Sequence, residues 1–374
     1  MQVRLPHGRT KAHLRMTDTV HSQPASIAPN DAASAEDIVV STGHLPHDDH
    51  VSRALHDAHN TYAGIADGRN SSIYPALEVA EPTQFGICVV GIDGRRYAVG
   101  AADVSFTIMS VSKPFVFALV CEAIGAEAAR ALIGVNSTGF PFNAIIPVEL
   151  QAGPRTNPMV NAGALVATSL IPGATPAEQW QQILSGLSRF AGRELTVNDA
   201  VYASASATNH RNRALARLLH SYGCLANDPD ATTDLYTRQC SLNVTAIDLA
   251  MMGATLADGG VQPVTGERIV SAGNCQAVLA VMMTAGLYET SGDWLYDVGL
   301  PGKSGISGGI VTIAPGKGGM ATYSPPLDAA GNSVRGQLAT RYLSRRLGLN
   351  LFASRAAIEP AQQGSLPVSH EGGA

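Results

Sequence analysis

Apolar residues recur at helical spacing in three stretches of the chain. They do so over residues 51–65, over the strongly apolar stretch 110–134, and over 333–349 near the end. A period of three to four residues gathers side chains along one side of a helix, and a helix that is apolar all round is buried. The pattern therefore predicts a helix after residue 50, a buried helix that begins near residue 110, and a closing helix.

Two further stretches favour antiparallel hairpins. Residues 85–100 hold two β-rich runs that flank Asp93-Gly94, and residues 308–327 hold two more that flank the turn at 315–318. Asp-Gly between such runs is a strong hairpin signal. Between the hairpins, at about 111–298, helix-like segments alternate with Asn-, Gly- and Pro-rich loops. We expect an α+β fold: strands from both ends of the chain in one antiparallel sheet, with helices packed on it and an inserted helical lobe.

The two ends of the chain differ in composition from the rest. Residues 1–50 are polar, aperiodic and rich in His, Ser, Ala, Asp and Pro, and residues 359–374 have the same character. Such segments cannot bury enough apolar surface to become ordered. We therefore expect a disordered arm over 1–50, a single folded domain over 51–358 and a disordered tail over 359–374.

Charge and composition exclude several classes of partner. The net charge of −5 provides no basic field for nucleic acid or for an anionic membrane. No apolar run is long enough to span a membrane, and residues 1–25 lack the apolar core of a signal peptide. The five cysteines are scattered and form no zinc-binding pattern, which favours a reduced, cytoplasmic chain without disulfides. We expect no metal or organic cofactor.

Lysine is rare in this chain and marks the candidate chemistry. Only four of the 25 cationic residues are lysines: Lys11, Lys113, Lys303 and Lys317. A buried lysine can lose its proton and act as a base, whereas arginine effectively cannot. Lysines kept among so many arginines are therefore candidates for catalysis.

Lys113 lies three residues after Ser110, at the predicted start of the buried helix. Residues at i and i+3 share a helix face, so the serine hydroxyl and the lysine amine can meet. Pro114 is tolerated only in the first helical turn, which places Ser110 at the helix N-terminus, where backbone N–H groups favour developing negative charge. A neutral lysine there would take the proton of the serine. The alternative is a helix cap followed by a solvated lysine.

A second lysine motif, Lys303-Ser304-Gly305, leads into the second predicted hairpin. K-[ST]-G lies on a strand beside the active site in serine enzymes of the penicillin-binding class, so we expect Lys303 to border the same cleft as Ser110. An incidental lysine in a Gly-rich loop is the alternative. Beyond residue 59 the histidines are His210, His220 and His370, which gives a Ser-His-Asp hydrolase few candidates for its base.

With these motifs the sequence resembles the serine-dependent glutaminase family, which shares the β-lactamase/penicillin-binding fold, over about residues 60–352. The stretches that look like family signatures are SVSK (110–113), STGFPFN (137–143), NPMVNAGAL (157–165), RNRALA (211–216), DLYTRQCS (234–241), GLYETSGDW (286–294), GLPGKSGISGGI (299–310) and SPPLDAAGNSVRG (324–336). The resemblance implies a homo-oligomer that hydrolyses the side-chain amide of L-glutamine to L-glutamate and ammonia, through a serine acyl-enzyme with a lysine base.

The resemblance also assigns roles to single residues. The family's nucleophile, its base and a tyrosine that passes a proton to the leaving amine match Ser110, Lys113 and Tyr288. The family's substrate-binding positions match Ser110, Asn161, Asn212, Tyr236, Tyr288 and Ile306, the last through a backbone N–H that holds the substrate carbonyl oxygen.

Two positions depart from the family pattern. The family usually has a tyrosine where this chain has Ile73, and here Tyr74 follows one residue late; in extended backbone that shift turns the tyrosine to the opposite face. The family usually has a substrate-binding glutamate where this chain has Ala205. A carboxylate that holds the α-ammonium group of the substrate would contribute about 1.5–3 kcal/mol. A serine amidase with a different amide substrate, and a catalytically weakened homologue that binds a metabolite or a partner, are the alternatives.

Overall fold

The computed structural model describes residues 43–150 and 156–354, which lie within one compact unit, Ile38–Ala374. Most of the predicted arm over 1–50, and all of the predicted tail over 359–374, fall outside the described residues. The first helix, α1 (Asp48–Tyr62), confirms the helix predicted after residue 50 but begins inside the range expected for the arm.

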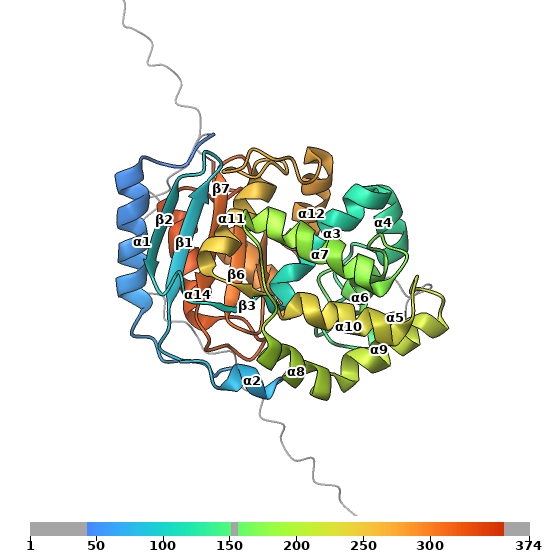
Figure 1. Ribbon diagram of the computed structural model, residues 1–374. Coiled ribbons are helices and arrows are strands. Elements are labelled where there is room, and N and C mark those ends of the chain that lie inside the picture. Colours follow the sequence, from blue (N-terminus) through green and yellow to red (C-terminus); the bar gives the residue numbers. More distant parts are fainter. Residues whose placement is uncertain (1–42, 151–155, 355–374) are drawn as a thin grey trace, which may run out of the picture. The chain divides into compact units, whose positions relative to one another are not determined.

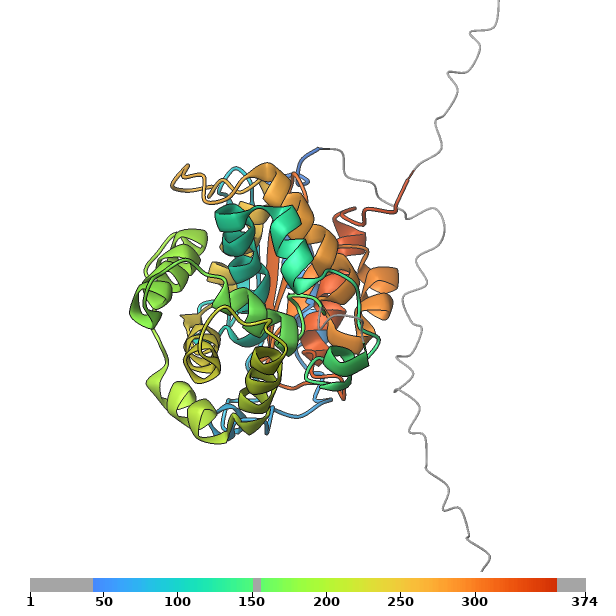
Figure 2. The same cartoon turned by 90° about the vertical axis from the view of Figure 1, so that its right-hand side faces the viewer.

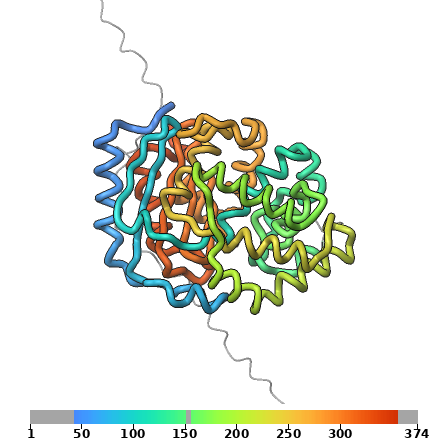
Figure 3. The backbone as a smooth tube through the Cα atoms, viewed as in Figure 1, coloured from blue at the N-terminus to red at the C-terminus, as the bar shows by residue number. Residues whose placement is uncertain are grey.

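A five-stranded antiparallel sheet joins the two ends of the folded chain, as predicted. Its order is β2-β1-β7-β6-β5, so β1 from the N-terminal hairpin pairs directly with β7 from the C-terminal hairpin (Figures 1 and 3). A second, two-stranded sheet pairs β3 with β4. The strands are β1 (Gly86–Gly91), β2 (Arg96–Gly100), β3 (Phe106–Thr107), β4 (Asn243–Val244), β5 (Gly302–Ser304), β6 (Gly309–Ala314) and β7 (Gly318–Tyr323).

Helices cover both faces of the sheet, because successive side chains of a strand point to opposite faces. Ile87 and Val89 of β1 belong to the apolar cluster formed with α1 and α14 (Val334–Arg346), which is the predicted closing helix. Cys88 and Val90 belong to the cluster on the other face, with α11 (Ala246–Ala257). A Cβ atom at Gly319 of β7 would lie 2.2 Å from a backbone oxygen of α11, so only glycine permits this close approach.

The middle of the chain forms the predicted helical lobe (Figure 2). The apolar stretch 110–134 was expected to be one helix, but Gly125, with φ +87°, divides it. Glycine adopts this backbone conformation without the steric cost that other residues pay. The remaining helices of the lobe and its surroundings are α2 (Pro75–Glu78), α3 (Ser112–Ile124), α4 (Ala126–Ile133), α5 (Ile146–Leu150), α6 (Asn161–Ser169), α7 (Pro176–Ala191), α8 (Asp199–Thr208), α9 (His210–Ser221), α10 (Pro229–Cys240), α12 (Ala272–Ala285) and α13 (Ser291–Val298).

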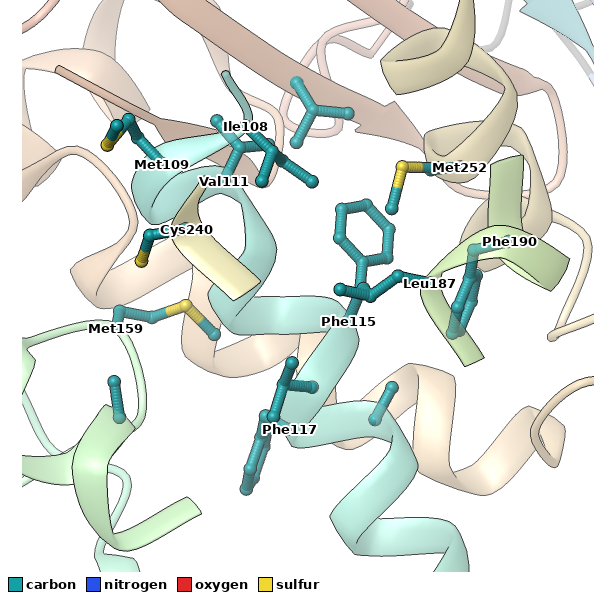
Figure 4. Close-up of a cluster of buried hydrophobic side chains, with 14 of the residues drawn as sticks. Ile108, Met109, Val111, Phe115, Phe117, Met159, Leu187, Phe190, Cys240 and Met252 are labelled. Atoms are coloured by element: carbon teal, nitrogen blue, oxygen red, sulfur yellow. The ribbon is translucent and has the colours of Figure 1, made fainter. Parts of the chain in front are cut away.

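The start of α3 lies in the interior of the fold. Figure 4 shows Phe115 and Phe117 of this helix among side chains from other elements, including Phe190 of α7 and Cys240 of α10. Burial on all sides explains why the stretch is apolar without a strong preference for one helix face. Within the described ranges, no helix combines the length and the apolar character that crossing a membrane requires.

Candidate active site

Ser110 lies in a short 3-10 turn, η2 (Met109–Val111), that runs directly into α3. This confirms the predicted position of Ser110 at a helix start, with Pro114 in the first turn. The residue before it, Met109, has a left-handed backbone with φ +46°, which is rare for a residue with a long side chain. The Ser112 hydroxyl donates to the Met109 carbonyl at 2.8 Å and so braces the turn. Strain of this kind is concentrated at functional sites.

Lys113 is almost fully buried, with 1% of its surface exposed. Its Nζ donates to Asn161 Oδ1 at 2.7 Å and to the Met159 carbonyl at 3.2 Å. Burial lowers the pKa of Lys113 from 10.5 to about 7, because a charged amine is costly to desolvate. A large fraction of the amine is therefore neutral at neutral pH. The direct contact between Nζ and Ser110 Oγ stays a prediction.

Three other predicted residues join Lys113 in one hydrogen-bonded group. Asn161, the first residue of α6, donates from Nδ2 to Asn212 Oδ1 of α9 at 2.9 Å. The Tyr236 hydroxyl of α10 donates to Asn161 Oδ1 at 3.2 Å. The structure thus brings together side chains from four helices, and Asn161 is the centre of the group.

Tyr288 approaches Ser110 from the other side, in the turn η3 (Tyr288–Thr290). Its backbone is also left-handed, with φ +57°. Its hydroxyl donates to the Ser304 carbonyl at 3.2 Å, and Ser110 is close enough to act on the pKa of the phenol. Burial raises the pKa of Tyr288 to about 12, against the smaller opposing effect of Ser110 and Ser304. The phenol therefore keeps its proton at neutral pH.

Lys303 lies on strand β5, as predicted, and is fully buried. Its Nζ lies 4.3 Å from the centroid of the Tyr288 ring and donates to the Ser304 carbonyl at 2.8 Å. Burial, and then the nearby Lys113, lower the pKa of Lys303 well below its usual value. Two lysines of this chain therefore belong to one buried cluster, which the scarcity of lysine had indicated.

Ile306 follows β5 in the tight turn that leads to β6. The turn is closed by the Gly305 N–H, which donates to the Gly309 carbonyl at 2.9 Å, and by the Gly308 N–H, which donates to the Gly305 carbonyl at 2.9 Å. A Cβ atom placed on Gly331 would lie 3.8 Å from Ile306 and 3.7 Å from the Tyr288 ring. Ile306 and Tyr288 therefore border the same loop.

Ile73 and Tyr74, where the chain departs from the family pattern, point in different directions. Tyr74 has extended backbone, and the expected change of face is seen: the Ile73 side chain is 49% exposed, whereas Tyr74 is half-buried. The Tyr74 hydroxyl donates to Asn209 Oδ1 at 3.4 Å, and Asn209 donates to Thr237 Oγ1 at 2.9 Å. Burial, and then Cys240 and Tyr74, raise the pKa of Tyr236. Ala205 of α8 is buried.

Sequence reasoning gave no role to two residues, Phe142 and Cys240, that lie beside these groups. The Phe142 ring lies 4.5 Å from the Tyr288 ring, centroid to centroid. Cys240, one helical turn after Tyr236, affects the pKa values of Lys113 and Lys303. The sequence did offer one signal for Cys240: it lies four residues, or one helical turn, after the candidate residue Tyr236 and therefore on the same helix face. In the described parts of the chain, no three His, Cys, Asp or Glu side chains are grouped so that they could hold a metal ion.

A model of the family described as glutaminase matches residues 68–352 of this chain. Glutaminase 2 of Yersinia pestis is 60% identical over 320 residues, which are 86% of this chain and 94% of that protein. A glutaminase of Brucella canis is 46% identical over 310 residues, which are 83% of this chain and 98% of that protein.

Solved structures show the same likeness. The probable glutaminase ybaS superposes with a TM-score of 0.81 at 42% identity, covering 83% of this chain and all of that chain (100%). Mglu in its Tris and glutamate form superposes with a TM-score of 0.78 at 37% identity, covering 83% of this chain and 69% of that chain. The predicted α+β fold, of the β-lactamase-like type, is confirmed.

Proposed function

Because the chain belongs to the glutaminase family, we propose that Ser110 is its nucleophile and that Lys113 is the base that activates it. The chain hydrolyses the side-chain amide of L-glutamine to L-glutamate and ammonia. The observation that carries the assignment is the buried amine of Lys113, one helical turn from Ser110 and with a pKa of about 7. A base with a pKa near the working pH transfers protons most efficiently.

Acylation begins when Lys113 takes the proton of Ser110 Oγ. The oxygen then attacks the side-chain carbonyl carbon of glutamine, and negative charge develops on the carbonyl oxygen. The backbone N–H groups of Ser110 and Ile306 stabilise this oxyanion. Donors fixed by a helix start and a tight turn need no reorganisation during the reaction, which is the main source of such stabilisation.

Tyr288 protonates the leaving nitrogen. Its hydroxyl donates to the Ser304 carbonyl and is close enough to Ser110 to feel it, and its high pKa keeps the proton available. As the C–N bond breaks, ammonia leaves with the proton that Tyr288 delivers, and Lys113 restores the phenol proton. Water then attacks the acyl-enzyme ester, the ester C–O bond breaks, and glutamate is released with Ser110 regenerated.

Asn161, Asn212 and Tyr236 bind the polar groups of the substrate. Amide and phenol side chains can both donate and accept hydrogen bonds, which suits a zwitterionic amino acid. Their mutual hydrogen bonds hold them in position before the substrate arrives. Mglu, which resembles this chain, has been solved in a Tris and glutamate form, which supports binding of the product glutamate in this site.

We also propose that the chain acts in the cytoplasm as a homo-oligomer. Cys88, Cys121, Cys224, Cys240 and Cys275 are all free thiols, which suits a reducing compartment. Light scattering after size-exclusion chromatography would measure the assembly, and a mass equal to one chain would contradict it.

An assay of ammonia release across glutamine, asparagine and simple amides tests the proposed function. Glutamine should be the preferred substrate, and Ser110→Ala should abolish turnover. Added hydroxylamine should capture the acyl group as a glutamyl hydroxamate only when Ser110 is present. Ser52→Ala, in α1, is the matched control and should keep full activity. Normal turnover by Ser110→Ala would overturn the assignment.

A further inference from the structure

We propose that Asn332 is a positioning residue for Tyr288. Its side chain ties the turn that bears Tyr288 to strand β5, and so sets where the tyrosine hydroxyl lies relative to Ser110. The inference rests on the proposed role of Tyr288 as proton donor.

Asn332 joins two segments that are far from it in the sequence. The side chain is fully buried. Its Oδ1 accepts from Ser304 Oγ of β5 at 2.5 Å. Its Nδ2 donates to Thr290 Oγ1 at 2.9 Å and to the Leu287 carbonyl at 3.5 Å. The two ends of one amide therefore bridge strand β5 and the turn η3.

The backbone of Asn332 is itself held by Asp328. The Asp328 carboxylate accepts from the N–H groups of Ala330 and Asn332, each at 2.9 Å, and from Gln337 Nε2 of α14 at 2.8 Å. The Asp328 N–H donates to the Asn332 carbonyl at 2.8 Å. This closed loop fixes Asn332 before its side chain reaches the site, so the bridge has a rigid base.

The turn at Tyr288 needs such support because its backbone is strained. A left-handed conformation is unfavourable for an aromatic residue and persists only where the surroundings impose it. Ser291 Oγ also supports the turn, by donating to the Tyr288 carbonyl at 2.7 Å and accepting from the Leu287 N–H at 3.0 Å. Asn332 adds the link from this turn to β5.

Ser304 makes the link specific to the tyrosine hydroxyl. Its carbonyl accepts from the Tyr288 hydroxyl, and its side chain donates to Asn332. Asn332 thus fixes both the backbone that carries Tyr288 and the residue that Tyr288 contacts at its far end. Loss of the bridge should displace the phenol and slow proton delivery, while the binding groups on α6, α9 and α10 stay in place.

Steady-state kinetics on glutamine test the proposal. Asn332→Ala should lower kcat by about ten- to hundredfold, as expected for a small displacement of a reacting group, with KM changed by less than about threefold. Thr290→Val removes one partner of the bridge and should lower kcat by about three- to tenfold. Thr290→Ser keeps the hydroxyl and should restore wild-type kcat. Thr255→Val, which removes a buried hydroxyl in α11, is the control and should leave both constants unchanged.

The Tyr288→Phe background separates this inference from the proposed function. If Asn332 acts through Tyr288, Asn332→Ala should not lower the residual kcat of Tyr288→Phe any further. An equal fall in both backgrounds, or full kcat in Thr290→Val, would overturn the inference. Wild-type kcat in Tyr288→Phe would instead overturn the proposed role of the tyrosine. If Asn332→Ala does not fold, the Thr290→Val and Thr290→Ser pair decides the question.

Discussion

The two sides of the candidate site are held in place in different ways. We call one side the sheet wall, made of Tyr288, Lys303, Ser304, Ile306 and Asn332. The other side is the helix wall, made of Asn161, Asn212 and Tyr236, with Tyr74 near it through Asn209. From the family pattern we expect Ala205 to border the helix wall. On the sheet wall, strand pairing and a hydrogen-bonded loop fix the backbone. On the helix wall, side chains from separate helices hold one another through single hydrogen bonds.

The departures from the family pattern are the exchange at Ile73, which leaves Tyr74 as the nearest tyrosine, and Ala205. Tyr74 lies near the helix wall, and we expect Ala205 to border it. A proton donor and an oxyanion site must be placed within a fraction of an ångström, so changes on the sheet wall would cost turnover. Groups that only bind the substrate contribute equally to the ground state and the transition state, so losing one raises KM and leaves kcat nearly unchanged. We therefore expect the sheet wall to serve the chemical step and the helix wall to serve substrate recognition.

Replacing each buried lysine gives the largest expected effect and tests which one is the base. Lys113→Met should lower kcat by about a hundredfold or more, because it removes the general base. Lys113→Arg should do nearly the same, since arginine keeps its proton. Lys303→Met should cost only about tenfold, through the lost hydrogen bond to Ser304.

Lys317→Met, in the turn between β6 and β7, is the matched control for these variants. It should keep wild-type kcat, and circular dichroism should confirm that all the variants fold. A larger loss for Lys303→Met than for Lys113→Met would move the base to the sheet wall.

The pH profile sharpens the same assignment. Lys113 must be neutral to act, and its pKa is about 7, so kcat/KM should fall about tenfold for each pH unit below 7. The same pKa shift makes folding stability rise with pH between about 7 and 10.5, because the unfolded chain binds an extra proton there. Below pH 7 the lysine is protonated in both states and its contribution to stability is constant. An activity that stays flat from pH 5 to 7 would contradict a lysine base.

Several parts of the fold and of the candidate site could be predicted from the sequence. Local patterns predicted both hairpins and the helix start at Ser110, because turn residues and proline act over a few positions. The scarcity of lysine pointed to Lys113 and Lys303 before any contact was known. The break at Gly125 was missed because apolar residues continue at helical spacing on both sides of it.

The bridge through Asn332 could not be predicted in this way. Its side chain contacts residues 28 and 42 positions away, and no periodicity connects segments so far apart. Similarly, the partner of the Tyr74 hydroxyl could not be predicted from the sequence. The hydrogen bond to Asn209 depends on how α2 packs near α8, which is a tertiary property.

Ala205→Glu tests recognition on the helix wall. A carboxylate at this position should pair with the α-ammonium group of glutamine and raise kcat/KM by about tenfold, mainly through a lower KM. Amides without an α-ammonium group should gain little. Ala205→Gln adds the same bulk without the charge and should give no gain. Unchanged glutamine kinetics in Ala205→Glu would show that another group already holds the ammonium.

The smallest expected effect belongs to Tyr74→Phe. The tyrosine hydroxyl makes a long hydrogen bond of 3.4 Å to Asn209, and Asn209 keeps its shorter bond to Thr237. One weak, neutral hydrogen bond corresponds to about 0.5–1 kcal/mol, or a two- to fivefold change. Because Tyr74 lies near the helix wall, this change should appear in KM for glutamine, with kcat unchanged.

Tyr202→Phe is the matched control for this last variant, since it removes a tyrosine hydroxyl that is bonded to Asp234 on the same helical lobe. It should lower the melting temperature and leave KM unchanged, because no residue of the candidate site receives that bond. Tyr74→Phe should instead raise KM and leave the melting temperature nearly unchanged. A fall in kcat for Tyr74→Phe as large as that for Tyr288→Phe would place Tyr74 in the proton-transfer chemistry. Recognition and chemistry would then no longer be divided between the two walls.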